Sequence, residues 1–108
     1  MDPIARNAKY YVNAAGKNPF REWLTRGIDG GPRAKVNTRI RRIGESGNYG
    51  DCEPVGDGVY ELRLDVGPGY RVYFGIDGNE IILLGGGDKS TQVSDITKAK
   101  DRWKDYDA

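Results

Sequence analysis

Four side chains in the second half of the sequence could together act on a phosphate group. They are Arg63, Arg71, Tyr73 and Lys89. Guanidinium groups bind phosphate through paired hydrogen bonds, an ammonium group adds positive charge, and a phenol can stack on a base. These residue types indicate a phosphodiester site if the fold brings them together. The alternative is that they form the ordinary polar face of a half-exposed sheet.

Three glycines precede Lys89 in the stretch LLGGGDKSTQ, which resembles part of a nucleotide-binding loop. Such a P-loop needs its lysine directly after the last glycine, whereas here Asp88 separates Gly87 from Lys89. A carboxylate at that point would repel a nucleotide phosphate. We therefore interpret the stretch as a flexible joint between a strand and a helix. Its glycines let the chain turn tightly beside the arginines, and Asp88 or Ser90 caps the helix.

Two segments with alternating apolar and polar residues predict the strands that hold the arginines. In residues 59–66 and 70–76, apolar side chains recur at every second position, as in half-buried strands. The intervening GPG, residues 67–69, predicts a three-residue connection and an antiparallel hairpin.

The register of this hairpin follows from the position of its turn. With Pro68 at the centre, Arg63 lies opposite Tyr73 and Asp65 lies opposite Arg71. Both pairs then share the polar face, while the apolar side chains share the other. A one-residue slip would destroy this match, so the pattern supports the register.

The remaining sequence predicts a short N-terminal strand, two helices, a turn-rich connection, a third strand and a last helix. Their expected ranges are 7–14, 16–26, 32–45, 45–58, 80–84 and 91–104. Asn18 as N-cap and Pro19 at the first helical position open the first helix. The last helix is expected to turn the following side chains inward: Val93, Ile96, Ala99 and Trp103.

This order of elements predicts an α+β fold in one domain, residues 1–108. We expect a small antiparallel β-sheet made of three C-terminal strands plus a short N-terminal strand. The two N-terminal helices and a C-terminal helix pack against one face of this sheet.

Charge is distributed unevenly along the chain. Residues 1–43 contain ten Lys or Arg and three Asp or Glu, whereas residues 44–108 contain seven and thirteen. Lys35, Arg39 and Arg42 recur at helical spacing and predict a basic ridge, which would suit a polyanion. The alternative is that both sets of charges are solvated surfaces.

The composition excludes several classes of chemistry. The chain has no histidine and a single cysteine, Cys52, so zinc or iron sites and catalytic systems that need histidine are excluded. We expect no metal and no cofactor. Because no apolar run is long enough to span a membrane and no signal-peptide core is present, we expect a cytoplasmic protein without a membrane partner.

Several sequence stretches together resemble the HigB-like, phage-related branch of the RelE/ParE toxins of type II toxin–antitoxin modules. They are NPFREWL, RIRRI, YELR, GPGYRVYF and GGDKSTQ, and the similarity covers about residues 16–104. The resemblance implies a RelE/ParE-like fold and a toxin that cleaves mRNA as a metal-independent endoribonuclease on the ribosome, inhibiting translation and growth. It also implies a HigA-like antitoxin with a helix-turn-helix domain as partner.

In this reading the substrate 2′-OH attacks the adjacent phosphorus. Arg63 and Arg71 would stabilise the added negative charge, with Lys89 as general acid and Tyr73 or Asp65 as proton acceptor. The residues expected to bind RNA are Lys35, Arg39, Arg42, Asp65 and Gln92. Two alternatives stay open: a non-enzymatic, ParE-like inhibitor of DNA gyrase, and a degenerate toxin that serves only as the partner of its antitoxin.

Overall fold

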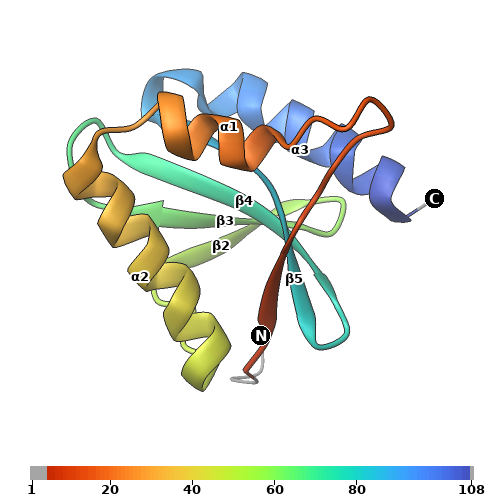
Figure 1. The fold of residues 1–108 in the computed structure, drawn as a ribbon, viewed down its shortest axis with the longest axis horizontal. Coiled ribbons are helices and arrows are strands. Elements are labelled where there is room, and N and C mark those ends of the chain that lie inside the picture. The colour runs from red at the N-terminus through yellow and green to blue at the C-terminus, as the bar shows by residue number, and fades with distance from the viewer. Residues whose placement is uncertain (1–4, 108) are drawn as a thin grey trace.

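A five-stranded mixed sheet forms the centre of the protein in the computed structural model, which describes residues 5–107 (Figure 1). The strands are β1 (Asn7–Tyr10), β2 (Cys52–Gly56), β3 (Val59–Leu64), β4 (Tyr70–Asp77) and β5 (Glu80–Asp88). The helices are α1 (Pro19–Arg26), α2 (Gly30–Ser46), the short 3-10 helix η1 (Lys89–Thr91) and α3 (Gln92–Asp107). The predicted α+β class is therefore confirmed.

The sheet differs from the expected one in its number of strands and in one pairing. Its strand order is β1-β5-β4-β3-β2, and β1 pairs with β5 in parallel while the other pairings are antiparallel. The expectation of a four-stranded, wholly antiparallel sheet was wrong on both points. Within residues 5–107, no helix combines the length and the apolar character needed to cross a membrane.

The extra strand, β2, falls within the segment interpreted as a turn-rich connection. It pairs with β3 at the edge of the sheet, and the pairing is irregular between Pro54 and Gly56. An edge strand tolerates proline because one side of its backbone needs no partner. Proline and the flanking glycines thus indicated a turn in this segment. The segment nevertheless forms a strand, because the edge of β3 is free to pair with it.

The start of α1 confirms the local sequence signals. Asn18 lies in an extended conformation, its side chain accepts a hydrogen bond from the Arg21 N–H, and Pro19 occupies the first turn. The following helix, α2, begins at Gly30, two residues before the predicted start at Pro32.

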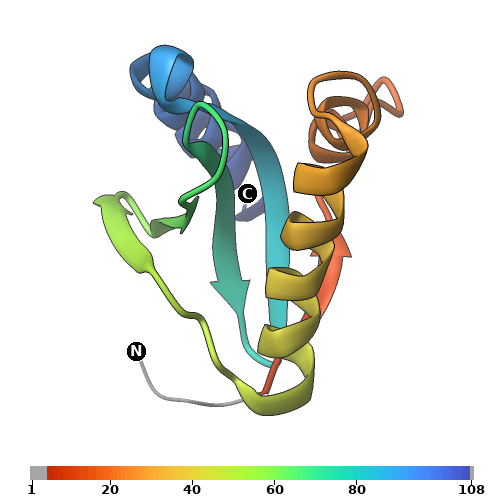
Figure 2. The same cartoon turned by 90° about the vertical axis from the view of Figure 1, so that its left-hand side faces the viewer.

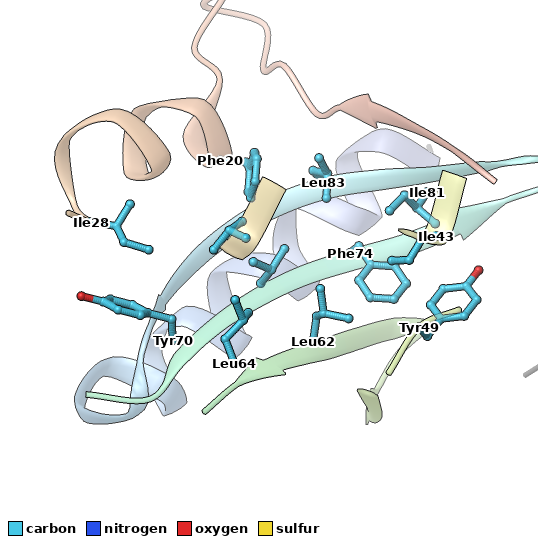
Figure 3. Packing of buried hydrophobic residues seen from close by; sticks show 12 residues of the cluster. Phe20, Ile28, Ile43, Tyr49, Leu62, Leu64, Tyr70, Phe74, Ile81 and Leu83 are labelled. Atoms are coloured by element: carbon cyan, nitrogen blue, oxygen red, sulfur yellow. The ribbon is translucent and has the colours of Figure 1, made fainter. Parts of the chain in front are cut away.

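Helices cover both faces of the sheet, which corrects the expectation of one covered face. Figure 3 shows the core between the sheet and the N-terminal helices, in which Phe20 of α1 and Ile43 of α2 pack with Leu62 and Phe74. The opposite face packs against α3 (Figure 2). Side chains alternate across each strand, so β5 supplies residues to both cores.

The contact of α3 with the sheet agrees with three of its four predicted inward residues. Ala99 is fully buried, and Ile96 and Trp103 pack against the second core. The prediction for Val93 was wrong, because its side chain is 82% exposed. This residue lies in the first turn of α3, where Gln92 and Asp95 face the sheet and Val93 points away from it.

The glycines of the LLGGGDKSTQ stretch lie within a strand. Strand β5 was expected to end at residue 84, but it continues through Gly85, Gly86 and Gly87 to Asp88. Side chains from the helices lie so close to this strand that an added Cβ would meet them: Arg102 at Gly85, Trp23 at Gly86 and Asp95 at Gly87. The glycines therefore allow close packing of helices on the strand, and the interpretation as a flexible joint was wrong.

Replacing Gly86 with alanine is expected to lower the free energy of unfolding by about 1–3 kcal/mol, as overpacking does in other cores. The new methyl group would overlap the Trp23 ring, which packs against the first core. Urea denaturation of the variant measures the effect. Gly31→Ala in α2 is the matched control, because among residues 5–107 nothing outside its own helix and chain neighbours lies within 4 Å of the added atom. A Gly86→Ala protein as stable as the wild type would show that Trp23 moves aside without cost.

The β3–β4 hairpin is shifted by two residues from the predicted register. Arg63 lies opposite Arg71, and Glu61 lies opposite Tyr73. The cause is the connection, which comprises the five residues 65–69 and is closed by a hydrogen bond from the Gly69 N–H to the Val66 carbonyl oxygen. A shift of two keeps every side chain on its predicted face. It does, however, change which polar groups meet.

Candidate functional site

A cationic hollow lies beside the β3–β4 connection, with a volume of about 340 Å³. Its three basic side chains come from three elements: Arg63 from β3, Arg71 from β4 and Lys89 from η1. The other residues of the lining are Asp51, Leu64, Asp65, Gly67, Pro68 and Gly69. The three basic residues that the sequence suggested could share a site thus line one hollow, which we call the cationic hollow.

Strand pairing and glycine positions bring these basic residues together. Arg63 and Arg71 are directly paired on neighbouring strands and point to the same face. On its other side Arg71 pairs with Gly87, which has no side chain to cover the guanidinium group. Lys89 follows one residue after the end of β5.

The turn that carries Lys89 is fixed by Asp88, as the capping prediction expected. The Asp88 carboxylate accepts hydrogen bonds from the backbone N–H and the hydroxyl of Ser90, at 2.8 and 2.5 Å. These bonds, first of all that from the hydroxyl, lower the pKa of Asp88 below its ordinary value. Asp88 is therefore an ionised cap that orders the turn, and Lys89 lies exposed beside it.

A buried carboxylate lies beneath the two arginines. Glu61 is 0% exposed, and its oxygens accept hydrogen bonds from Arg63 Nε at 2.9 Å, Gln92 Nε2 at 2.8 Å and the Tyr73 hydroxyl at 3.1 Å. Arg71 Nε lies 3.8 Å from the same carboxylate. Glu61 therefore links two strands and the start of α3 through one charged group.

The ionisation of Glu61 results from two opposing effects. Burial alone would raise the pKa of the carboxyl group, but the hydrogen bonds from Arg63, Gln92 and Tyr73 outweigh it and bring the pKa below its ordinary value. The anion in turn raises the pKa of Arg63. A negative charge between two facing guanidinium groups also reduces their mutual repulsion.

Arg71 retains hydrogen-bonding capacity that residues 5–107 do not use. Its side chain is only 13% exposed, and Nε is buried without a hydrogen-bond partner among residues 5–107. One hydrogen bond, from Nη1 to the Tyr70 carbonyl oxygen at 3.3 Å, is all that this guanidinium donates within the described chain. A buried donor without a partner is unfavourable. Arg71 also lines the hollow, so an anion there can accept hydrogen bonds from the part of its guanidinium group that remains exposed.

Tyr73 and Gln92 do not line the cationic hollow. Tyr73 is 0% exposed, and burial followed by the nearby Glu61 raises the pKa of its hydroxyl group. It was expected opposite Arg63, but it lies opposite Glu61 and donates to that carboxylate. Gln92 was expected to contact RNA, but its side-chain amide donates a hydrogen bond to the same carboxylate. Both side chains thus hold Glu61.

The basic ridge of α2 divides into exposed and inward-turned residues. Lys35 and Arg42 are exposed. Arg39 reaches across to the sheet and donates to the carbonyl oxygens of Arg63, Tyr49 and Asp51, at 2.6, 2.9 and 3.2 Å. Burial lowers the pKa of Arg39. Arg39 was expected to bind RNA, but its hydrogen bonds hold the backbone of β3 at Arg63 and the segment before β2 in place.

A second hollow lies between α2 and the end of β3, with a volume of about 300 Å³; we call it the α2 groove. Its lining residues are Lys35, Thr38, Arg39, Arg42, Leu64, Asp65 and Val66. Leu64 and Asp65 also line the cationic hollow, so the two hollows adjoin. Asp65, expected opposite Arg71 in a strand, instead lies in the connection at their junction.

The sequence did not single out Glu61. It stands two residues before Arg63, so the two side chains share one face of the strand, but this spacing is the same for a buried and an exposed ion pair. The incorrect register concealed that it also faces Tyr73. In the part of the chain that the structure describes, His, Cys, Asp and Glu nowhere gather in threes that could hold a metal ion.

Fold and site together define an α+β protein with a mixed five-stranded sheet and a cationic hollow that can receive an anion. No protein-family model matches the chain. A Haemophilus influenzae protein, described only as uncharacterized, is 50% identical over 82 residues, which cover 75% of this chain and 82% of that protein. The chain belongs to the same family as this Haemophilus influenzae protein.

Proposed function

We propose that this protein is a toxin of a type II toxin–antitoxin module, of the RelE/ParE class and HigB-like, that acts as an endoribonuclease on mRNA. The observation that carries the proposal is the cationic hollow. Arg63, Arg71 and Lys89 converge there from three separate elements, and the guanidinium of Arg71 donates a single hydrogen bond within residues 5–107. Such a set of donors matches the negative charge of a phosphodiester and of its transition state.

The proposed reaction uses the 2′-hydroxyl of the substrate as the nucleophile. It attacks the adjacent phosphorus, the bond to the 5′-oxygen of the next nucleotide breaks, and a cyclic phosphate and a free 5′-hydroxyl result. Arg71 and Arg63 stabilise the additional negative charge. Lys89 donates the proton to the leaving oxygen, and the proton of the 2′-hydroxyl passes to water. Tyr73 acts indirectly, through Glu61.

The proposed partners follow from the same assignment. The ribosome would present the mRNA, and the exposed Lys35 and Arg42 lie beside the hollow where they can contact RNA phosphates. A HigA-like antitoxin with a helix-turn-helix domain would hold the toxin inactive in the cytoplasm.

Mapping new 5′ ends of mRNA after induction of the protein in growing bacteria tests this function. We expect growth arrest within a few generations and new 5′-hydroxyl ends inside translated regions, absent from uninduced cells. Growth arrest with DNA damage and without new ends would contradict the nuclease and favour the gyrase inhibitor. Normal growth at high protein levels would favour the degenerate toxin.

A further inference from the structure

We propose that the α2 groove is a nucleobase subsite beside the cationic hollow and that Asp65 selects guanine in it. This inference rests on the proposed function, because it takes RNA as the substrate. It adds a specificity that neither the basic residues nor the fold class implies.

The first support is the continuity of the two hollows. They share Leu64 and Asp65, so a group bound in one lies next to a group bound in the other. In single-stranded RNA each phosphate is followed by a sugar and its base, and an unpaired base can be turned away from its neighbours. With a phosphate in the cationic hollow, the flanking base lies within reach of the α2 groove.

The second support is the chemistry of the groove. Its floor contains the apolar side chains of Leu64 and Val66, against which the flat face of a base can pack. Lys35 and Arg42 stand at its margin without ion-pair partners among residues 5–107, and they can contact the phosphates on either side. A volume of about 300 Å³ lies at the lower end of the range for small-molecule sites.

The third support is the state of the Asp65 carboxylate. It is exposed, and within residues 5–107 it makes neither an ion pair nor a side-chain hydrogen bond. Arg39, one of the basic residues of α2 that line the groove with it, already donates to three carbonyl oxygens. The carboxylate is therefore free to accept hydrogen bonds from a ligand at the junction of the two hollows.

A free carboxylate discriminates between the four bases by their Watson–Crick edges. An ionised Asp only accepts hydrogen bonds, and it can accept two at once. Guanine presents two adjacent donors, N1–H and the N2 amino group. Adenine and cytosine present one amino group beside an acceptor nitrogen, and uracil presents one N–H between two carbonyl groups. Guanine is therefore the base that can donate a hydrogen bond to each oxygen of Asp65 without placing one of its own acceptor atoms against the carboxylate.

The test compares the bases beside the cleavage sites in cells that express wild-type protein or Asp65→Asn. We expect guanine to be enriched about tenfold at one position beside the wild-type cuts, as for a bidentate contact to a base. In Asp65→Asn the enrichment is lost and shifts toward adenine or cytosine, because an amide pairs a donor with an acceptor. Glu45→Gln is the matched control, since this exposed carboxylate on α2 pairs with Arg41 outside both hollows.

The outcomes separate this inference from the proposed function. Wild-type cuts without a guanine preference, or a preference that Asp65→Asn retains, would overturn the inference and leave the nuclease intact. If no cuts occur, the proposed function fails, and binding of guanosine 5′-monophosphate decides the inference. Shifts of the Leu64 and Val66 methyl resonances with this nucleotide, absent with uridine 5′-monophosphate and in Asp65→Asn, support it. Equal shifts or none overturn it.

Discussion

Replacing Arg71 with alanine is expected to abolish growth arrest and mRNA cleavage while leaving the fold intact. Arg71 is the most enclosed of the three basic residues of the hollow, and its guanidinium donates a single hydrogen bond within the described chain. Loss of one donor that stabilises a charged transition state typically slows a reaction about 10²–10³-fold. Cleavage is measured from mapped 5′ ends, and folding from circular dichroism of the purified variant.

The fold should tolerate this change because Glu61 keeps its other partners. Arg71 lies 3.8 Å from the carboxylate, whereas Arg63, Gln92 and Tyr73 donate to it at hydrogen-bonding distance. The Arg71→Lys variant retains the charge without the planar fork and should have an intermediate activity.

Arg41→Ala is the control for the loss of a positive charge. Arg41 lies on α2, pairs within residues 5–107 only with Glu45, and lines neither hollow. This variant should arrest growth as the wild type does. A fully toxic Arg71→Ala protein, present in normal amounts, would show that the cationic hollow is not the site of action.

The alternation of residues in β3 and β4 was enough to predict which side chains share a face, but not which of them pair. Shifting one strand by two residues exchanges every partner and moves no side chain to the other face. The register depends on the five-residue connection 65–69, in which Gly67 and Gly69 adopt positive φ angles of 53° and 80°. That conformation lets the chain loop more widely than the GPG motif indicated.

Two further features depend on residues that are distant in the sequence. The glycines of β5 are needed because the side chains of Trp23 and Arg102, from two helices, pack against that strand. Without these distant residues, a run of glycines indicates a turn. Similarly, a glutamate in an alternating strand is typical of an exposed face. The burial of Glu61 follows from the approach of α3, which brings Gln92 to it.

Replacing Glu61 should have the largest effect on stability. Removing one partner of a buried ion pair lowers the free energy of unfolding by about 3–5 kcal/mol, because the charge of the other partner is left buried without an opposite charge. In Glu61→Ala, Arg63 and Arg71 would face each other without the anion between them, and the buried Tyr73 hydroxyl would lose its acceptor. Glu61→Gln keeps the shape and should lose less. Urea denaturation at pH 7 measures both variants, and Glu45→Gln, in an exposed pair, should remain within about 1 kcal/mol of the wild type.

The pH dependence distinguishes the loss of the charge from the loss of packing. The pKa of Glu61 is lower in the folded protein than its ordinary value of 4.5, so the folded state binds the proton less readily than the unfolded state. The stability that the anion contributes is present above pH 4.5 and is lost as the pH falls through the lower, folded-state pKa. The difference between wild type and Glu61→Gln should therefore be largest near neutral pH and shrink below pH 4.5. A difference that stays constant down to pH 3 would mean that Glu61 stabilises the protein through its shape and not through its charge.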